Sequence, residues 1–290
     1  MIFEYDTAKL QALLETVVIQ NCSAEAVQWL QERKALQSSA DFNTSFALVS
    51  RKTGKSVVHT VEDQTPQLQQ LFPGFTVTGW TIDRLCRVWL LTYVNPADKE
   101  KYFSSIENLF RSAAVNELVA LYSALPLLAY PAGWVKRCAE GIRSNMGDVL
   151  ESIMYNNPYP ANYLEQSAWN QLVLKAIFTG KQIQFITGLD KRANKELAYT
   201  LSDYAHERWA AHRTVPPQLW RLTGPFIDEK LLPDIKKAFA EDDVQTQKAI
   251  ALAIAQSAYP PAKEVLSTNP ALATAIAGNA ISWEKDITTI

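Results

Sequence analysis

Residues 81–96 read TIDRLCRVWLLTYVNP, and this stretch decides the fold class of the chain. Its apolar and aromatic side chains recur at intervals of three or four residues, which is the period of an α-helix. Thr81 stands at the expected start, and Asn95-Pro96 ends the helix because proline biases the preceding residue away from helical geometry. The stretch therefore predicts a helix with one apolar face, formed by Ile82, Leu85, Cys86, Trp89, Leu90 and Tyr93.

The same helical period recurs along most of the chain on both sides of this stretch. It indicates an N-terminal helix with Leu10, Leu13, Leu14, Val17 and Val18 on one face, and further helices near residues 98–113, 114–129, 131–145, 147–156, 166–179, 194–213, 228–241, 243–258, 261–268 and 271–284. We therefore predict an all-α chain in which more than about half of the residues are helical. Each pair of helices takes about 30 to 40 residues, as in a HEAT-like α-solenoid. An irregular helical bundle of antiparallel helix pairs is the alternative, and either architecture forms a single domain over residues 1–290.

The exception to the helical period lies between Phe46 and Val61. Apolar residues there flank the segment RKTGK, residues 51–55, whose Thr-Gly pair is typical of a tight turn. A short hairpin is one interpretation, and a helix end followed by an irregular loop is the other. We favour the loop, because an isolated hairpin is marginally stable without further strands.

Composition limits the classes of function. The chain has 290 residues, of which 48% are hydrophobic and 20% charged, with a formal net charge of -2. Such a balance is ordinary for a globular protein and provides no basic surface for nucleic acid. Cys22, Cys86 and Cys138 form no C-x-x-C pair, so we expect three reduced, buried thiols. Since residues 1–10 lack the basic and apolar regions of a signal peptide, we expect a cytoplasmic protein.

One segment is apolar enough to be considered as a membrane span. Residues 118–135 form a run of 18 residues without a charge, at the lower limit of a spanning length. Pro126, Pro131 and Gly133 interrupt this run. We therefore expect two buried helical pieces broken near Pro131 and no transmembrane span.

Acidic residues give the helix expected over 194–213 a charged side. Asp203 and Glu207 are a like-charge pair at i, i+4, which destabilises a helix unless water or a positive group surrounds it. Since a helix in the middle of a solenoid has less water around it, we predict that Lys175 or Arg192, from neighbouring segments, lies within ion-pair distance of the carboxylates. The acidic residues that share this side are Glu196, Asp203 and Glu207.

Arg208 falls in the middle of the apolar side of the same helix. The side chains around it there are Leu197, Leu201, Tyr204 and Ala205. Arg208 is either a structural arginine that bonds helix-end carbonyls or a carboxylate, or an anion-binding residue in a pocket. We favour the structural role, because a buried charge usually has a structural partner.

His206 has the spacing to share a metal ion with Asp203 and Glu207. The remaining histidines, His59 and His212, complete no H-E-x-x-H motif, so we favour a solvated polar side and expect no metal. The sequence also lacks the glycine-rich motifs G-x-G-x-x-G, P-loop and G-x-S-x-G. We therefore expect no cofactor.

Lys175 lies on a helix that is apolar nearly all round. Its neighbours include Trp169, Leu172, Val173, Ile177 and Phe178. A helix of this kind is buried, so the ammonium group needs an ion-pair partner or a lowered pKa. We favour the ion pair over a reactive amine, because a catalytic lysine needs an accessible pocket.

Four motifs in the second half of the chain resemble those of one family. They are Asn157-Pro158-Tyr159-Pro160, Trp169 with Leu174-Lys175-Ala176-Ile177-Phe178, Gly188-Leu189-Asp190-Lys191-Arg192-Ala193-Asn194, and His206-Glu207-Arg208-Trp209-Ala210-Ala211 with Arg213, Pro216 and Trp220. In these residues the chain resembles the EboA family, and the similarity extends over most of residues 40–230.

The resemblance implies a bacterial protein encoded in a cluster that moves secondary-metabolite precursors across the inner membrane. It implies that the partners are other proteins of this cluster, among them a prenyltransferase-like membrane protein, or a small apolar metabolite. A cytoplasmic protein that reaches the inner membrane through a partner would fit this setting. The family supplies no reaction and no catalytic residues.

Two hypotheses for the function follow. The first, which we favour, is a non-catalytic scaffold, adaptor or small-molecule-binding protein in precursor processing and traffic to the periplasm. The second is an enzyme acting on a metabolite precursor, with a polar site formed by Lys175, Asp203, His206, Glu207 and Arg208. Convergence of these five side chains on one open cavity would favour the enzyme. The full set of candidate polar residues is Lys175, Asp190, Arg192, Asn194, Asp203, His206, Glu207, Arg208 and Arg213.

Overall fold

The computed structural model describes residues 2–34, 39–61, 64–241 and 243–287. Within these residues the secondary structure is helical, with isolated bridge residues and no strand, so the all-α prediction is confirmed. The α-helices up to residue 163 are α1 (Thr7–Asn21), α2 (Ala24–Arg33), α3 (Ser39–Thr53), α4 (Gln64–Leu71), α5 (Ile82–Leu91), α6 (Lys99–Ser112), α7 (Val115–Ser123), α8 (Val135–Arg143), α9 (Gly147–Met154) and α10 (Tyr159–Tyr163). Those that follow are α11 (Gln166–Phe178), α12 (Lys195–Ala210), α13 (Leu232–Phe239), α14 (Val244–Gln256), α15 (Pro260–Ser267) and α16 (Pro270–Ala277). Short 3-10 helices are η1 (Leu125–Leu127), η2 (Pro131–Trp134), η3 (Ile183–Phe185), η4 (Pro217–Leu222) and η5 (Gly224–Phe226).

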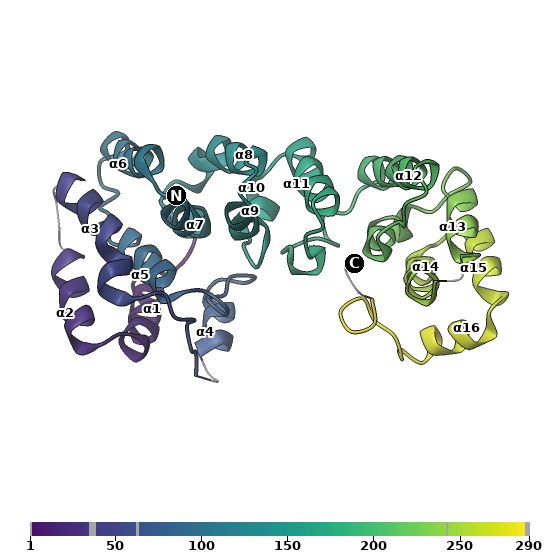
Figure 1. Cartoon of the computed structure of the whole chain (residues 1–290), viewed down its shortest axis with the longest axis horizontal. Helices are drawn as coiled ribbons and strands as arrows, with labels where there is room; N and C mark the ends of the chain where they lie inside the picture. The colour runs from purple at the N-terminus through teal and green to yellow at the C-terminus, as the bar shows by residue number, and fades with distance from the viewer. Residues whose placement is uncertain (1, 35–38, 62–63, 242, 288–290) are drawn as a thin grey trace. The chain divides into compact units, whose positions relative to one another are not determined.

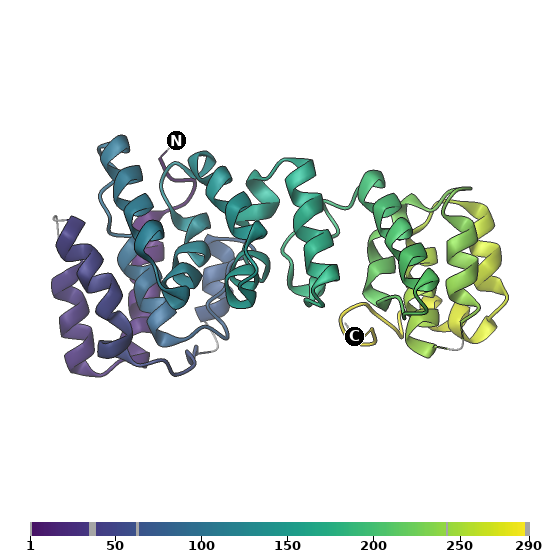
Figure 2. The same ribbon diagram turned by 45° about the horizontal axis from the view of Figure 1, so that its top comes forward.

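The chain packs as two compact units (Figure 1). Unit 1 is Met1–Ala168, and unit 2 is Trp169–Ile290. Helices α2 and α3 of unit 1 contact each other and run antiparallel (Figure 2). The assignment of a single domain and the choice between a solenoid and a bundle stay predictions.

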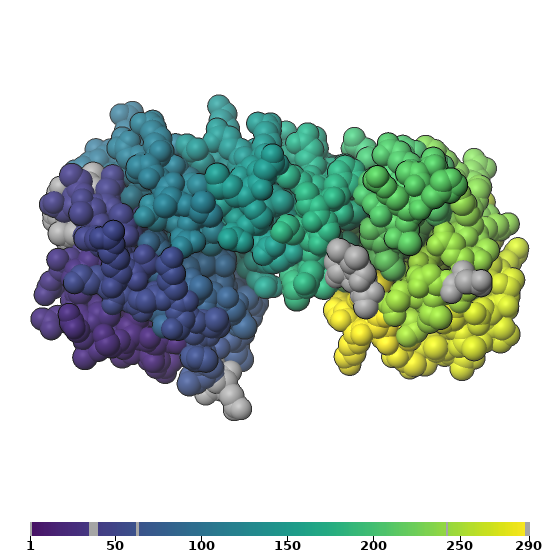
Figure 3. Space-filling view, in the orientation of Figure 1, coloured from purple at the N-terminus to yellow at the C-terminus, as the bar shows by residue number. Residues whose placement is uncertain are grey.

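Helix α5 forms the centre of unit 1, where it contacts α1, α2, α3 and α7. Nine of its ten residues are buried, and Arg84 is half-buried. The helix predicted from residues 81–96 is therefore confirmed, but the single apolar face is wrong, because other helices cover α5 on several sides. The purple and blue segments around it form one continuous mass on the face seen in Figure 3.

A buried ion pair lies within α5. Asp83 Oδ2 accepts a hydrogen bond from Arg87 Nη1 at 2.6 Å, and both side chains are at most 3% exposed. Arg87 Nε also donates to the carbonyl oxygen of Phe46 in α3, at 3.0 Å. The guanidinium group therefore has two partners and joins α3 to α5.

The segment from Phe46 to Val61 is a helix end followed by a loop, as favoured from the sequence. Helix α3 ends at Thr53, and Gly54 follows with a φ of 77°, a left-handed conformation in which glycine has no Cβ to clash. The loop then meets the start of α5 in a single antiparallel bridge between Val57 and Thr81. The hairpin alternative is wrong.

The uncharged segment 118–135 is broken, as predicted. Helix α7 ends at Ser123, and the chain reaches Pro131 through η1 and a left-handed residue, Tyr130, with a φ of 56°. Pro131 then begins η2. In the described part of the chain, each helix is too short or too polar to cross a membrane.

Helix α14 forms the centre of unit 2, where it contacts α13, α15, α16, η4 and η5 (Figure 1). Its buried face contains small residues, including Ala249 and Ala253. A Cβ added at Gly224 of η5 would lie 2.7 Å from the carbonyl oxygen of Ala253, so the two backbones approach closely. The alanine-rich sequence of α14 permits this packing.

We expect Asp83→Ala to lower the free energy of unfolding by about 3 kcal/mol, because it leaves the buried Arg87 guanidinium without its carboxylate. Glu140→Ala is the matched control. It removes an i, i+3 partner of Arg137 whose side chain is 55% exposed, and should cost less than about 1 kcal/mol. Urea denaturation of both variants measures the difference. Equal losses would contradict the structural importance of the Asp83–Arg87 pair.

Candidate functional site

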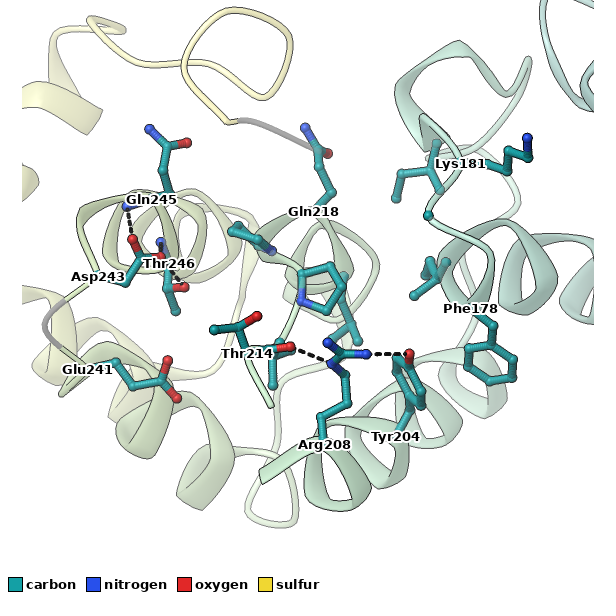
Figure 4. A pocket seen from close by; sticks show the side chains of 17 residues that line it. Phe178, Lys181, Tyr204, Arg208, Thr214, Gln218, Glu241, Asp243, Gln245 and Thr246 are labelled. Carbon is teal, nitrogen blue, oxygen red and sulfur yellow. Dashed lines mark hydrogen bonds between the residues drawn. The ribbon is translucent and has the colours of Figure 1, made fainter. Parts of the chain in front are cut away.

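A pocket of about 490 Å³ lies in unit 2 (Figure 4). Three segments form it: the end of α11 with the residues that follow, the end of α12 with the segment leading into η4, and the turn between α13 and α14. Its lining combines apolar walls with a few charged side chains. This combination is typical of sites for small molecules.

The end of α11 supplies one wall. The helix ends at Phe178, and Gly180 adopts a left-handed φ of 64°. The N–H of Lys181 then donates to the carbonyl of Ala176 at 2.8 Å, which satisfies a helix-end acceptor and reverses the chain. Because of this reversal, Lys181 and Ile183 line the same pocket as Phe178.

The end of α12 reverses in a similar way. His212 is left-handed, with a φ of 52°, and the N–H of Arg213 donates to the carbonyl of Arg208 at 2.8 Å. The chain returns over the last turn of the helix, and the carbonyl of Thr214 accepts a hydrogen bond from Arg208 Nε. Val215 to Leu219 then line the pocket.

Arg208 is held in place at the edge of the pocket. Besides the bond to Thr214, its Nη1 donates to the hydroxyl of Tyr204 at 3.1 Å, and Figure 4 shows both bonds. The Tyr204 ring packs against Phe178 with centroids 4.4 Å apart. Among the described residues, Arg208 Nη2 has no hydrogen-bond partner. The side chain is half-buried, so the expectation that it is shut off from water is wrong.

Two carboxylates line the pocket near the start of α14, on the left in Figure 4. Glu241 accepts a hydrogen bond from Trp209 Nε1 at 2.7 Å. Asp243 caps α14, and its Oδ2 accepts from the Thr246 hydroxyl at 2.6 Å and from the Thr246 N–H at 2.7 Å. The bonds from Thr246 lower the pKa of Asp243 below its ordinary value. Both carboxylates are therefore held by neighbouring donors of unit 2.

The acidic side of α12 faces solvent. Glu196, Asp203 and Glu207 are all exposed. The prediction that a neighbouring segment covers this side and brings Lys175 or Arg192 to Asp203 or Glu207 is wrong. Water screens the like charges, which then cost only a few tenths of a kcal/mol.

His206 has a partner that the sequence did not indicate. Its Nε2 lies 2.6 Å from Asp234 Oδ1, and Ser202 donates to the other oxygen of Asp234. Asp203 and Glu207 take no part in this cluster. In the part of the chain that the structure describes, no group of three His, Cys, Asp or Glu side chains is arranged to hold a metal ion.

Asp190 lies in a separate ion-pair cluster. Its two oxygens accept from Arg221 Nε at 2.7 Å and Arg221 Nη2 at 2.6 Å, and Glu284 accepts from the same Nη2 at 2.9 Å. Arg221 is 8% exposed, whereas the two carboxylate side chains are more than half exposed. The cluster joins the loop before α12 to the C-terminal segment.

The remaining candidates have structural positions outside the pocket lining. Asn194 caps α12 by accepting from the Leu197 N–H at 3.0 Å. The Arg192 guanidinium lies over the Trp169 ring, 5.0 Å from its centroid, and burial lowers the pKa of Arg192. Arg213 is exposed. Lys175 is half-buried, so the expectation that helix α11 is buried all round is wrong.

Of the nine candidate residues, only Arg208 lines this pocket. The sequence placed Phe178 and Tyr204 on helices but gave them no role in a site. An aromatic residue at a helix end, such as Phe178, could have indicated the wall of a pocket. Lys181, Glu241 and Asp243 were missed. Their positions depend on chain reversals and on a turn more than thirty residues after Arg208, which no local pattern in the sequence indicates.

These features define an all-α protein with a pocket of small-molecule size. The family model described as metabolite traffic protein EboA matches residues 10–224, which is more than half of the chain, and the chain belongs to this family. The name of the family connects it with metabolite traffic. No curated protein and no solved structure matches the chain.

Arg221 and Arg208 should differ in their contribution to stability. We expect Arg221→Ala to lower the free energy of unfolding by about 2 kcal/mol or more, because the side chain is buried and joins two segments. Arg208→Ala should cost about 1 kcal/mol, because its two hydrogen bonds go to neutral acceptors and the side chain is only half-buried. Urea denaturation measures both. A larger loss for Arg208→Ala would show that its role is mainly structural.

Proposed function

We propose that this chain is a non-catalytic small-molecule-binding protein of metabolite traffic, and that it holds a small, largely apolar metabolite in the pocket of unit 2. The pocket volume of about 490 Å³ carries the proposal, because sites for small molecules measure about 300 to 1,000 Å³. The family name supports the general role.

The aromatic wall of the pocket favours an apolar ligand. Phe178 packs on Tyr204 and still leaves 52% of its surface exposed. Apolar area that is removed from water contributes about 25 cal/mol per Å². A ligand that covers Phe178 therefore removes the exposed apolar area of this ring from water, and that burial favours binding.

In this role the chain would act in the cytoplasm and receive or deliver its metabolite through other proteins of the same cluster. A membrane-bound, prenyltransferase-like partner would bring it to the inner membrane, and the precursor would continue to the periplasm. The resemblance of the chain to the EboA family is the basis for these partners.

Catalysis by the five polar residues is the alternative. Lys175, Asp203 and Glu207 are outside the pocket lining, and His206 is paired with Asp234. Arg208 alone contributes to the pocket. A reaction needs its acid, base and nucleophile within hydrogen-bond reach of one substrate atom, so the separation of these side chains supports binding over an enzyme with this site.

The neutral fluorescent probe phenylnaphthylamine tests binding in the pocket. We expect Phe178→Ala to weaken its affinity about three- to tenfold, because part of the apolar wall is lost. Phe185→Ala is the matched control, since Phe185 is 43% exposed and is outside the pocket lining. Fluorescence titration measures both dissociation constants. Absence of binding by the unmodified protein, or equal effects of the two variants, would overturn the proposal.

A further inference from the structure

We propose that the metabolite held in this pocket carries one anionic group, a carboxylate or a phosphate, and that Arg208 binds this group. The inference rests on the proposed function and specifies its ligand class. It starts from the position of the Arg208 side chain, which lines the pocket and has a donor group, Nη2, without a partner among the described residues.

The guanidinium group of Arg208 is oriented before any ligand arrives. The Thr214 carbonyl holds Nε, and the Tyr204 hydroxyl holds Nη1 at 3.1 Å. Arginine stays protonated in proteins, and its planar group matches the oxygens of carboxylate and phosphate. Because two bonds fix the side chain, an incoming anion orders little further. A hydrogen bond between the Arg208 guanidinium and an anionic oxygen has a charge on both partners. Charge-assisted hydrogen bonds of this kind are about twice as strong as neutral ones.

The other charged groups of the pocket set the direction of the ligand. Lys181 belongs to the lining on the side of α11, and its amino group points away from Arg208 in Figure 4. Glu241 and Asp243 lie on the other side of Arg208 from Phe178 in Figure 4, each held by donors of its own. The carboxylates repel an anion, so the anionic group is directed to Arg208.

The position of the apolar wall fixes the remaining part of the ligand. Tyr204 lies directly beside Arg208, and Phe178 packs on the far side of the Tyr204 ring (Figure 4). Pro216 and Pro217 belong to the same lining. An apolar body can therefore pack on these rings while its anionic end reaches Nη2. The end that faces Glu241 and Asp243 is suited to a hydrogen-bond donor such as a hydroxyl group.

Two matched probes test this ligand class. Anilinonaphthalene sulfonate and phenylnaphthylamine share one ring system, and only the first carries an anionic group. We expect the protein to bind the sulfonate about tenfold more tightly. Arg208→Gln should remove this preference and leave the neutral probe within twofold of its original affinity. Arg213→Gln, which changes an exposed arginine outside the pocket lining, should leave both affinities unchanged.

The outcomes separate the two proposals. If the neutral probe does not bind, or if Phe178→Ala leaves both affinities unchanged, the proposed function fails. If both probes bind with similar affinity and Arg208→Gln changes neither, the pocket binds small molecules but the anionic class is wrong. Equal losses for Arg208→Gln and Arg213→Gln would indicate a general charge effect and would also overturn the role of Arg208.

An independent observation in unit 1 concerns two cysteines. The Sγ atoms of Cys22 and Cys86 lie 3.7 Å apart, with Cys22 half-buried at the end of α1 and Cys86 fully buried in α5. We infer that this pair is oxidised reversibly to a disulfide by a peroxide. A disulfide bond measures about 2.05 Å, so small side-chain rotations bring the sulfurs together.

The half-buried thiol is the one that reacts first. The hydrogen bond with Cys86 lowers the pKa of Cys22, whereas the same bond and burial raise the pKa of Cys86. The Cys22 thiolate attacks a peroxide oxygen, the O–O bond breaks, and the leaving hydroxide takes a proton to form water. The Cys86 thiol then attacks the sulfenic acid sulfur, the S–S bond forms, and a second water leaves. The two thiols thus supply both electrons that the peroxide accepts.

Treatment of the full chain with hydrogen peroxide tests this pair. We expect the thiols titrated after denaturation to fall from three to one, with a mass loss of two hydrogens and full recovery on reduction. Cys138→Ser should still form the disulfide, because Cys138 is buried elsewhere and burial raises its pKa to about 12. Cys22→Ser should abolish it. Three remaining thiols, or sulfinic acid at Cys22 without a disulfide, would overturn the inference.

Discussion

Every α-helix leaves N–H and C=O groups unpaired at its two ends, and this constraint shapes the pocket of unit 2. Asp243 and Asn194 satisfy the starts of α14 and α12 with their side chains. Gly180 and His212 take left-handed conformations so that the chain can satisfy the ends of α11 and α12. In an all-α unit these reversals decide which side chains face one another. The pocket is assembled from segments at helix ends, with Asp243 serving both as a cap and as part of its lining.

The fold class could be predicted because helical periodicity is a local property of the sequence. The burial of α5 on all sides could not, since it depends on α1, α2, α3 and α7, which come from distant segments. The site shows the same limit. Arg208 was recognised from its place in an apolar stripe. The like-charge pair Asp203 and Glu207 led to a wrong ion-pair prediction, because that prediction assumed a neighbouring segment over this side of α12, and the side is exposed to solvent. The partner of His206, Asp234, lies 28 residues away and gave no local signal.

The polar residues of unit 2 divide into groups with different physical roles. Arg221 is enclosed by carboxylates and joins two segments, so its hydrogen-bonding capacity serves stability. The carboxylates beside Arg221 are mostly exposed, and none of the three belongs to the pocket lining. Arg208 differs, because the donor that its fixed guanidinium leaves unpaired lies at the edge of a cavity, whereas the unpaired Nη1 of Arg221 is buried. A group that is oriented and still has an unused donor is suited to binding a ligand.

The two ends of the pocket differ in whether the family model matches them. Arg208, Phe178 and the segment Val215–Leu219 lie within residues 10–224, whereas Glu241 and Asp243 lie beyond that range. The apolar wall and the proposed anion site therefore belong to the part of the chain that the family model describes. The acidic end belongs to the part outside it. If both ends contact one ligand, the matched region recognises its anionic, apolar part. Discrimination at the other end then depends on the start of α14 and the turn before it.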